Sequence, residues 1–197
     1  MKYLRSLRLC GAAGALVLAG CASQQEQLVP QVQQGERAGV KTISVAAAPL
    51  VCDGPRCPAL AAVWAADKPG QAVLTIGLPY QSAEVTGADF HLGPAGVVRV
   101  RSRSSANAGV LGYPATAFDV PLRLATQIAY TPRSWLRVYT ADGKHVDETI
   151  DSGEARARAA EAFAYFITAV EQAGGQGSST DAPRGGLFER LGIEEKK

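Results

Sequence analysis

The chain has 197 residues, of which 47% are hydrophobic and 19% are charged, and this balance is enough for one domain with a buried core. Its 20 Lys and Arg residues nearly offset its 18 Asp and Glu residues, and Lys2, Arg5 and Arg8 all lie in the first twenty positions. Without those three, 17 basic residues face 18 acidic ones, which excludes the strongly basic surface that nucleic acid binding requires.

Residues 1–20 have the pattern of an export signal. The basic stretch MKYLRSLRLC is followed by the apolar run GAAGALVLAG, which is shorter than the ~20 residues needed to span a membrane. Leu18-Ala19-Gly20-Cys21 resembles the lipobox of bacterial lipoprotein precursors. The resemblance implies that residues 1–20 are removed and that the Cys21 thiol carries a diacylglycerol. Because no aspartate follows Cys21, it also implies sorting to the outer membrane rather than retention at the inner membrane, and we expect the protein on the periplasmic face.

Composition divides the remaining chain into three parts. Residues 21–40 are rich in glutamine and poor in large apolar side chains, so we expect a lipidated tether. Residues 41–173 hold the apolar patterns of a single domain. Residues 174–197 begin with a Gly/Ser-rich stretch that predicts a flexible linker and tail.

Alternating apolar and polar residues predict strands in the domain. The glycine-proline pair 93–94 and the Ala-Asp-Gly step 141–143 predict two hairpins, and the small residues of 104–115 predict a long loop. The expected strands are Lys41–Val51, Gln71–Tyr80, Val85–Leu92, Gly96–Arg103, Ser134–Thr140 and Lys144–Ile150.

The clearest helix is predicted over Ser152–Ala173, capped by Asp151 with Glu154 and ended by Gly174. Its apolar stripe comprises Ala159, Phe163, Phe166, Ile167 and Val170. The segment Asp119–Thr131 fits both helix and strand, and its length and alanines favour helix. The run CPALAAVWAAD after Cys57 also predicts a short helix, with Trp64 facing the core. The expected fold is α+β: an antiparallel sheet of about five to seven strands, with a long C-terminal helix and one or two shorter helices packed on it.

The stretch VCDGPRCP contains the two cysteines that remain for pairing. In the lipoprotein interpretation Cys10 is lost with the signal and Cys21 carries lipid, and export places Cys52 and Cys57 in an oxidising compartment. A disulfide is therefore favoured. A metal site would need two more ligands, and a redox pair usually has two intervening residues rather than four.

The search for catalytic motifs finds neither a nucleophile elbow nor a phosphate-binding loop. Asp89 and His91, two residues apart on one strand face, form the single local carboxylate–imidazole pair. His145, Asp147 and Glu148 are too poor in histidine for a convincing zinc site. We therefore expect no cofactor and no metal.

Two segments could bind a partner. Arg99, Arg101 and Arg103 alternate with small or apolar residues, so a strand would align three guanidinium groups on one face, although such a face can also simply be solvated and guard a sheet edge. In the tail, Leu187, Phe188 and Leu191 could form a short docking face, with disorder as the simpler interpretation.

The sequence thus favours a non-enzymatic binding, assembly or structural module of the cell envelope, with the membrane and an envelope protein or peptidoglycan as partners. The alternative is an envelope hydrolase that uses Asp89 and His91.

Overall fold

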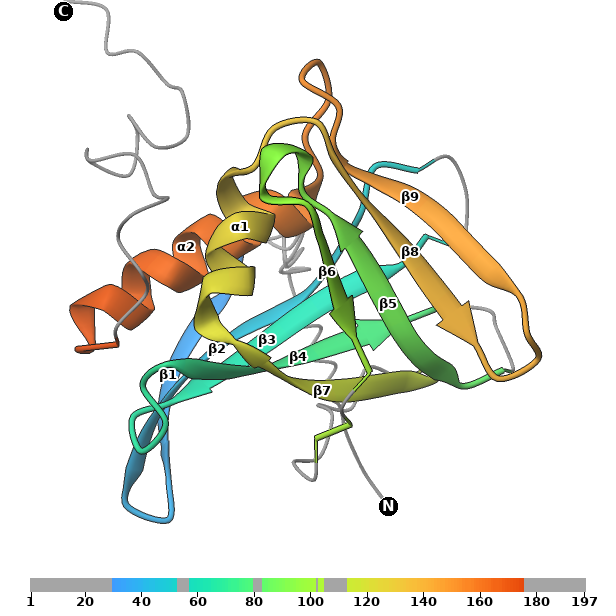
Figure 1. The fold of residues 1–197 in the computed structure, drawn as a ribbon. Helices are drawn as coiled ribbons and strands as arrows, with labels where there is room; N and C mark the ends of the chain where they lie inside the picture. Colours follow the sequence, from blue (N-terminus) through green and yellow to red (C-terminus); the bar gives the residue numbers. More distant parts are fainter. Residues whose placement is uncertain (1–29, 53–56, 80–82, 102, 105–112, 176–197) are drawn as a thin grey trace, which may run out of the picture.

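Nine strands in two antiparallel sheets, together with two α-helices, make up the described part of the chain (Figure 1). The computed structural model describes residues 30–52, 57–79, 83–101, 103–104 and 113–175. This arrangement confirms the predicted α+β class, although the strands number more than expected and form two sheets rather than one. One sheet has the strand order β1-β2-β3-β4-β7 and the other has the order β6-β5-β8-β9.

Along the chain, β1 to β7 precede α1, and β8, β9 and α2 follow it. Their bounds are β1 Val32–Arg37, β2 Val40–Pro49, β3 Ala59–Ala65, β4 Gln71–Gly77, β5 Val85–His91, β6 Val97–Val100, β7 Ala115–Pro121, α1 Leu122–Tyr130, β8 Ser134–Thr140, β9 His145–Asp151 and α2 Arg158–Gln172. A short 3₁₀ turn, Gly93–Ala95, connects β5 to β6, and a turn around Gly143 connects β8 to β9. Both predicted hairpins are confirmed.

The prediction of a helix after Cys57 is wrong, because this segment forms strand β3. The alanines of this run favour a helix locally, but the segment pairs with β2 on one side and β4 on the other. Leu60, Ala62 and Trp64 alternate toward the core, and Trp64 is 1% exposed. Tertiary pairing on both edges therefore overrides local helix propensity. The prediction that Trp64 faces the core is confirmed.

Strand β1 lies inside the range predicted as tether. Its six residues pair with β2 from Val32↔Val45 to Arg37↔Val40, across a turn in which Ala38 and Gly39 both have positive φ. The segment buries little apolar surface, so composition did not reveal it; the backbone ladder holds it instead. Part of the segment predicted as tether, Val32–Arg37, thus belongs to the five-stranded sheet.

Helix α2 begins six residues later than predicted. Asp151 ends β9 and accepts a hydrogen bond from the Gly153 amide at 2.7 Å, and Ser152 accepts bonds from the next two amides, so these side chains form a turn instead of a cap. The predicted apolar stripe is fully buried, and Gly174, with φ of 89°, ends the helix as expected.

The ambiguous segment Asp119–Thr131 contains both of the structures that its pattern fits. Its first residues complete β7, and α1 starts directly after Pro121. Pro121 suits the boundary because its ring fixes φ at −64° and it needs no amide partner at a helix start.

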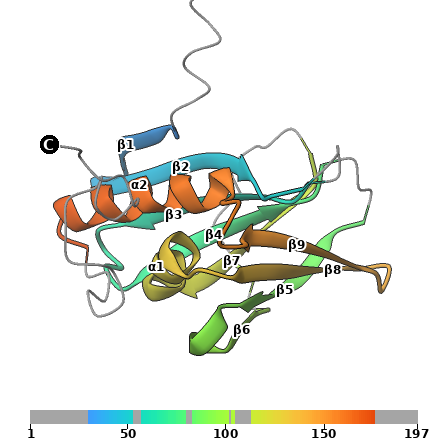
Figure 2. The same ribbon diagram turned by 90° about the horizontal axis from the view of Figure 1, so that it is seen from above.

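One hydrophobic core joins both sheets and both helices. Helix α2 packs along β2 and β3 and against α1, as both views show (Figures 1 and 2). Two isolated bridges link the sheets: Arg103↔Phe118 beyond the end of β6, and Val51↔Thr149 beyond the end of β2. The core-facing side of the four-stranded sheet is apolar, which leaves its other side for polar and aromatic residues.

Candidate functional site

The candidate site is the solvent-facing side of the four-stranded sheet, which we call the outer face. Because side chains alternate along a strand, pairing register places every second residue of β6, β5, β8 and β9 on this side. Its members are Val97 and Arg99 on β6, with Arg101 directly beyond its end; Gly87, Asp89 and His91 on β5; Trp135, Arg137 and Tyr139 on β8; and His145, Asp147 and Thr149 on β9.

Charge alternates across the middle row of the outer face. Arg99 lies opposite Asp89, Asp89 opposite Arg137, and Arg137 opposite Asp147. Opposite charges on directly paired strand positions stabilise a sheet, by roughly 0.2–1 kcal/mol per pair. The row therefore supports the sheet and also presents an arginine at each of two positions across the face.

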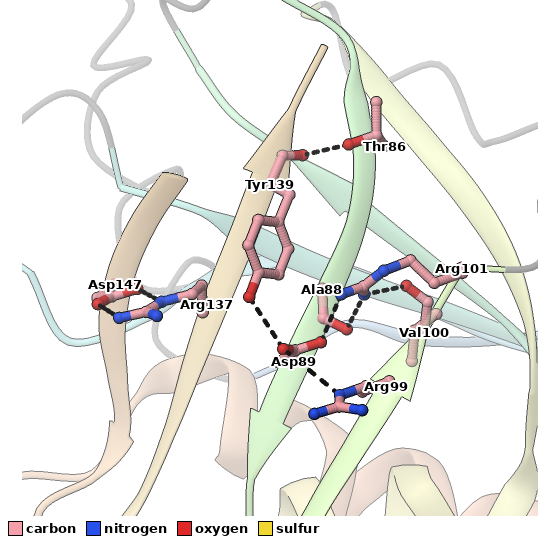
Figure 3. A network of polar contacts seen from close by, with 9 residues as sticks. All are labelled: Thr86, Ala88, Asp89, Arg99, Val100, Arg101, Arg137, Tyr139 and Asp147. Carbon is pink, nitrogen blue, oxygen red and sulfur yellow. Dashed lines mark hydrogen bonds and ion pairs between the residues drawn. The ribbon is translucent and has the colours of Figure 1, made fainter. Parts of the chain in front are cut away.

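Asp89 is the centre of the polar contacts (Figure 3). Its residue exposure is 8%, and its two carboxylate oxygens accept hydrogen bonds from Arg101 Nη2 at 2.7 Å and from the Tyr139 hydroxyl at 2.9 Å. Arg99 Nε lies 4.0 Å away. A carboxylate this deeply buried is stable only when such partners replace water.

Arg101 reaches Asp89 by crossing directly over Gly87. A Cβ at Gly87 would lie 2.6 Å from Arg101 Cδ and 2.7 Å from the Val100 carbonyl oxygen, so a side chain there would collide with both. The Arg101 guanidinium also donates to the carbonyls of Ala88 and Val100 at 2.8 Å and lies 4.8 Å from the Tyr139 ring centre. The glycine is thus required for close approach rather than for an unusual φ.

Arg137 and Asp147 form a two-pronged ion pair beside this cluster. Arg137 Nε donates to Asp147 Oδ1 at 2.7 Å and its Nη2 donates to Oδ2 at 2.5 Å. These hydrogen bonds lower the pKa of Asp147 and raise the pKa of Arg137 above its ordinary value. Both side chains remain more than one third exposed, so the pair contributes little net stability but holds both groups in place.

Aromatic rings occupy the row next to the charged one. His91 stacks on Trp135 with ring centres 3.5 Å apart and an angle of 9° between the ring planes. The Arg137 guanidinium lies 5.5 Å from the Trp135 ring centre. The stacked pair therefore borders the ion pairs and fixes the imidazole against an aromatic face.

The structure does not assemble the predicted Asp89–His91 pair into a dyad. The Asp89 carboxylate is held by Arg101 and Tyr139, whereas His91 lies on Trp135. In the described part of the chain, His91 makes no hydrogen bond to a serine or a carboxylate.

The three arginines predicted as a group have different surroundings. Arg101 binds Asp89, and Arg103 forms an ion pair with Glu84 at 2.8 Å. The Arg99 side chain is 76% exposed, and its nearest carboxylate is the shared Asp89 at 4.0 Å. Of the three, Arg99 alone keeps an outward-facing cation without a close ion pair.

The disulfide predicted from VCDGPRCP is present. Cys52 and Cys57 are bonded, with their Cα atoms 5.8 Å apart, in the connection between β2 and β3. The bond fixes the junction that the sequence suggested, except that a strand follows it in place of a helix. Cys21 and the tail residues Leu187, Phe188 and Leu191 lie outside the described residues.

Within the described ranges, no three His, Cys, Asp or Glu side chains gather closely enough to hold a metal ion. Neither described helix is both long and apolar enough to cross a membrane. A groove of about 350 Å³ also crosses the five-stranded sheet near Val63 and Val73. Because its lining combines Arg37 and Lys68 with Asp67 and Asp119, it favours no ligand charge.

Comparison with known proteins finds no family model, no curated protein and no solved structure that matches this chain. The function must therefore be argued from the outer face itself.

Sequence reasoning missed Gly87, Trp135, Arg137 and Tyr139. The alternation in SWLRVYT could have placed the last three on one side of a strand. Their proximity to Asp89 depends on the β5–β8 pairing, which joins residues about fifty positions apart and has no local signal.

Proposed function

We propose that this protein is a lipid-anchored lipoprotein of the periplasmic face of the outer membrane and that it acts as a non-enzymatic binding or assembly module. The outer face is the surface that contacts an envelope partner. One observation carries the proposal: Arg99 projects 76% exposed from the outer face, while the neighbouring arginines are held by carboxylates. A fixed surface with one available guanidinium suits recognition of a carboxylate or phosphate.

The contacts that Asp89 and His91 make favour binding over hydrolysis. A hydrolytic site needs a base within hydrogen-bond reach of a nucleophile or water. Here both oxygens of Asp89 are engaged by Arg101 and Tyr139, and His91 is stacked on Trp135. The arrangement supports a rigid recognition surface.

The lipobox at Leu18–Cys21 supports the anchoring half of the proposal. The described domain begins at Pro30, nine residues beyond Cys21. Nine residues span at most about 30 Å when fully extended. The domain therefore stays close to the membrane surface, closer than a tether of residues 21–40 would have held it.

Anchoring is tested by labelling cells with a clickable palmitate analogue. The native protein should acquire the label and fractionate with the outer membrane, and the Cys21→Ser variant should lose both properties. Label retained by Cys21→Ser would contradict lipidation at this residue.

Partner binding is tested in intact cells with a photocrosslinking amino acid in place of His91, which pairs with Val97 on the outer face, so that Arg99 is kept. Arg123, which is exposed on α1 and not on the four-stranded sheet, is the matched control position. We expect a discrete crosslinked product from position 91 that is absent from position 123. Identical products from the two positions, or none from position 91, would contradict the proposed surface.

A further inference from the structure

In the β5–β6 hairpin, some backbone amides and carbonyls of β6 point toward β5, and the others point away from it. The Leu92 amide donates to the Gly96 carbonyl at 2.9 Å, so the Leu92 amide points toward the strand that follows the turn. Antiparallel pairs alternate between hydrogen-bonded and non-hydrogen-bonded. With the observed register, Phe90/Val98 and Ala88/Val100 are hydrogen-bonded, whereas His91/Val97 and Asp89/Arg99 are not. The amides and carbonyls of Val97 and Arg99 consequently point away from β5.

That direction is the open edge of the four-stranded sheet. Strand β6 is terminal in the order β6-β5-β8-β9, and the bridge from Arg103 to Phe118 lies beyond its last residue. Across the residues that the structure describes, β5 is the one strand that pairs with β6. Two amides and two carbonyls thus form a ready template for one more strand.

The side chains along this edge favour a particular occupant. Val97 is 48% exposed and is the one large hydrophobic residue exposed in the described ranges. Arg99 is the cation that lacks a close ion pair, whereas Arg101 and Arg103 are held by Asp89 and Glu84. An added strand would therefore meet an apolar contact and a positive charge on the same face.

We propose that the β6 edge binds an extended, acidic peptide segment of a partner protein as an additional strand. This inference rests on the proposed binding function and specifies its mode. Backbone hydrogen bonds to Val97 and Arg99 hold the segment, and a carboxylate opposite Arg99 selects it. A second copy of the chain suits the edge less well because its own β6 carries the same exposed arginine, and like charges repel.

The arginines also explain why the edge does not pair indiscriminately. Short edge strands that carry positive charge resist pairing with neutral or basic strands. The same charge attracts an acidic segment, so one feature provides both protection and selectivity.

The test uses a capped peptide in which valine and glutamate alternate, and a twin in which lysine replaces every glutamate. Binding to the isotope-labelled chain is followed by NMR, with the amides of Val97 and Arg99 as reporters. We expect the acidic peptide to shift these amides and the lysine twin to bind at least tenfold more weakly. Arg99→Gln should remove most of this difference between the two peptides.

A matched pair of variants isolates the backbone contribution. Val97→Ala and Val97→Pro both lose the valine side chain, but proline also removes the outward amide. Both should fold, because this amide makes no bond to β5 and proline is tolerated at the first residue of an edge strand. Val97→Pro should bind the acidic peptide at least tenfold more weakly than Val97→Ala.

Equal binding of the acidic peptide by the two Val97 variants would overturn strand addition. NMR shift changes confined to another surface, or no binding at millimolar peptide, would also overturn it. A dimer in sedimentation that Val97→Pro abolishes would identify a second copy as the occupant and overturn the acidic segment. If the crosslink from position 91 persists in Val97→Pro cells, the partner is real and the mode of binding is wrong. If that crosslink never forms, the proposed function itself fails.

Discussion

The substitution Gly87→Ala tests whether the outer face is organised by close approach of Arg101. The methyl group would lie 2.6 Å from Arg101 Cδ and 2.7 Å from the Val100 carbonyl oxygen, compared with about 3.5–4.0 Å for ordinary contacts between non-bonded carbon atoms. The long side chain can move away, but the carbonyl belongs to the β5–β6 ladder and moves only with the strand. Arg101 would then lose its contact with Asp89.

The expected change in the free energy of unfolding is the sum of destabilising and stabilising contributions. Overpacking lowers the free energy of unfolding by about 1–3 kcal/mol. Alanine raises it by about 0.5–1 kcal/mol because alanine restricts the unfolded chain more than glycine does. Loss of the Arg101 contact to the buried Asp89 lowers it by about 1 kcal/mol, a modest value because the Arg101 side chain is 47% exposed. We expect Gly87→Ala to lower the free energy of unfolding by about 2 kcal/mol.

Urea unfolding measures this change, and two further variants decide its cause. Gly70→Ala is the matched control, because no atom lies within 4 Å of a Cβ built there, and it should be neutral or slightly stabilising. In the Arg101→Ala background, Gly87→Ala should cost about 1 kcal/mol less, because the arginine atoms that it meets are gone. Equal effects of Gly87→Ala and Gly70→Ala, or strict additivity with Arg101→Ala, would refute the reasoning.

Three further predictions concern the rest of the domain. Tyr139→Phe removes a hydrogen bond to the buried carboxylate and should lower the free energy of unfolding by about 1 kcal/mol, which urea unfolding would detect; no change would show that the hydroxyl bond contributes nothing net. Replacing Cys52 and Cys57 together with serine should cost roughly 2 kcal/mol because the closed loop is short, and an unchanged thermal midpoint would contradict this. The Thr140 hydroxyl, followed by Lys144, lowers the pKa of Asp142 to about 2, so its stabilising contribution exists above about pH 4 and is lost as the pH falls toward 2. Thr140→Val should raise this pKa toward its ordinary value in an NMR titration, and a value that stays near 2 would assign the shift to Lys144 alone.

The sequence predicted those elements whose signal is local. The β8–β9 hairpin carries a turn step between two alternating runs, and the α2 stripe repeats at helical spacing, so the hairpin and the C-terminal end of α2 agree with prediction to within one residue, whereas the start of α2 is six residues off. The disulfide followed from compartment and elimination. The hairpin and helix inferences use residues that are close together along the chain, and the disulfide joins two cysteines five positions apart.

The errors arose where distant segments decide the structure. The alanine-rich run around Trp64 becomes a strand because β2 and β4 flank it, and the glutamine-rich β1 is ordered by its ladder with β2. For the same reason the sequence pairs Asp89 with His91 on the same strand, whereas its partners are Arg101, directly after β6, and Tyr139 on β8. A polar site on a sheet is defined by pairing register, and register is a long-range property.

The placement of β1 and β6 gives the proposed function a mechanical consequence. The chain enters the domain through β1, the terminal strand of the five-stranded sheet, and the proposed docking edge is β6, the terminal strand of the other sheet (Figure 1). Force from the proposed lipid anchor would therefore act first on the β1–β2 ladder and not on the proposed docking strand β6. The proposed anchoring and the proposed partner binding are thus compatible, because the chain on the anchor side leads into one sheet and the docking edge belongs to the other.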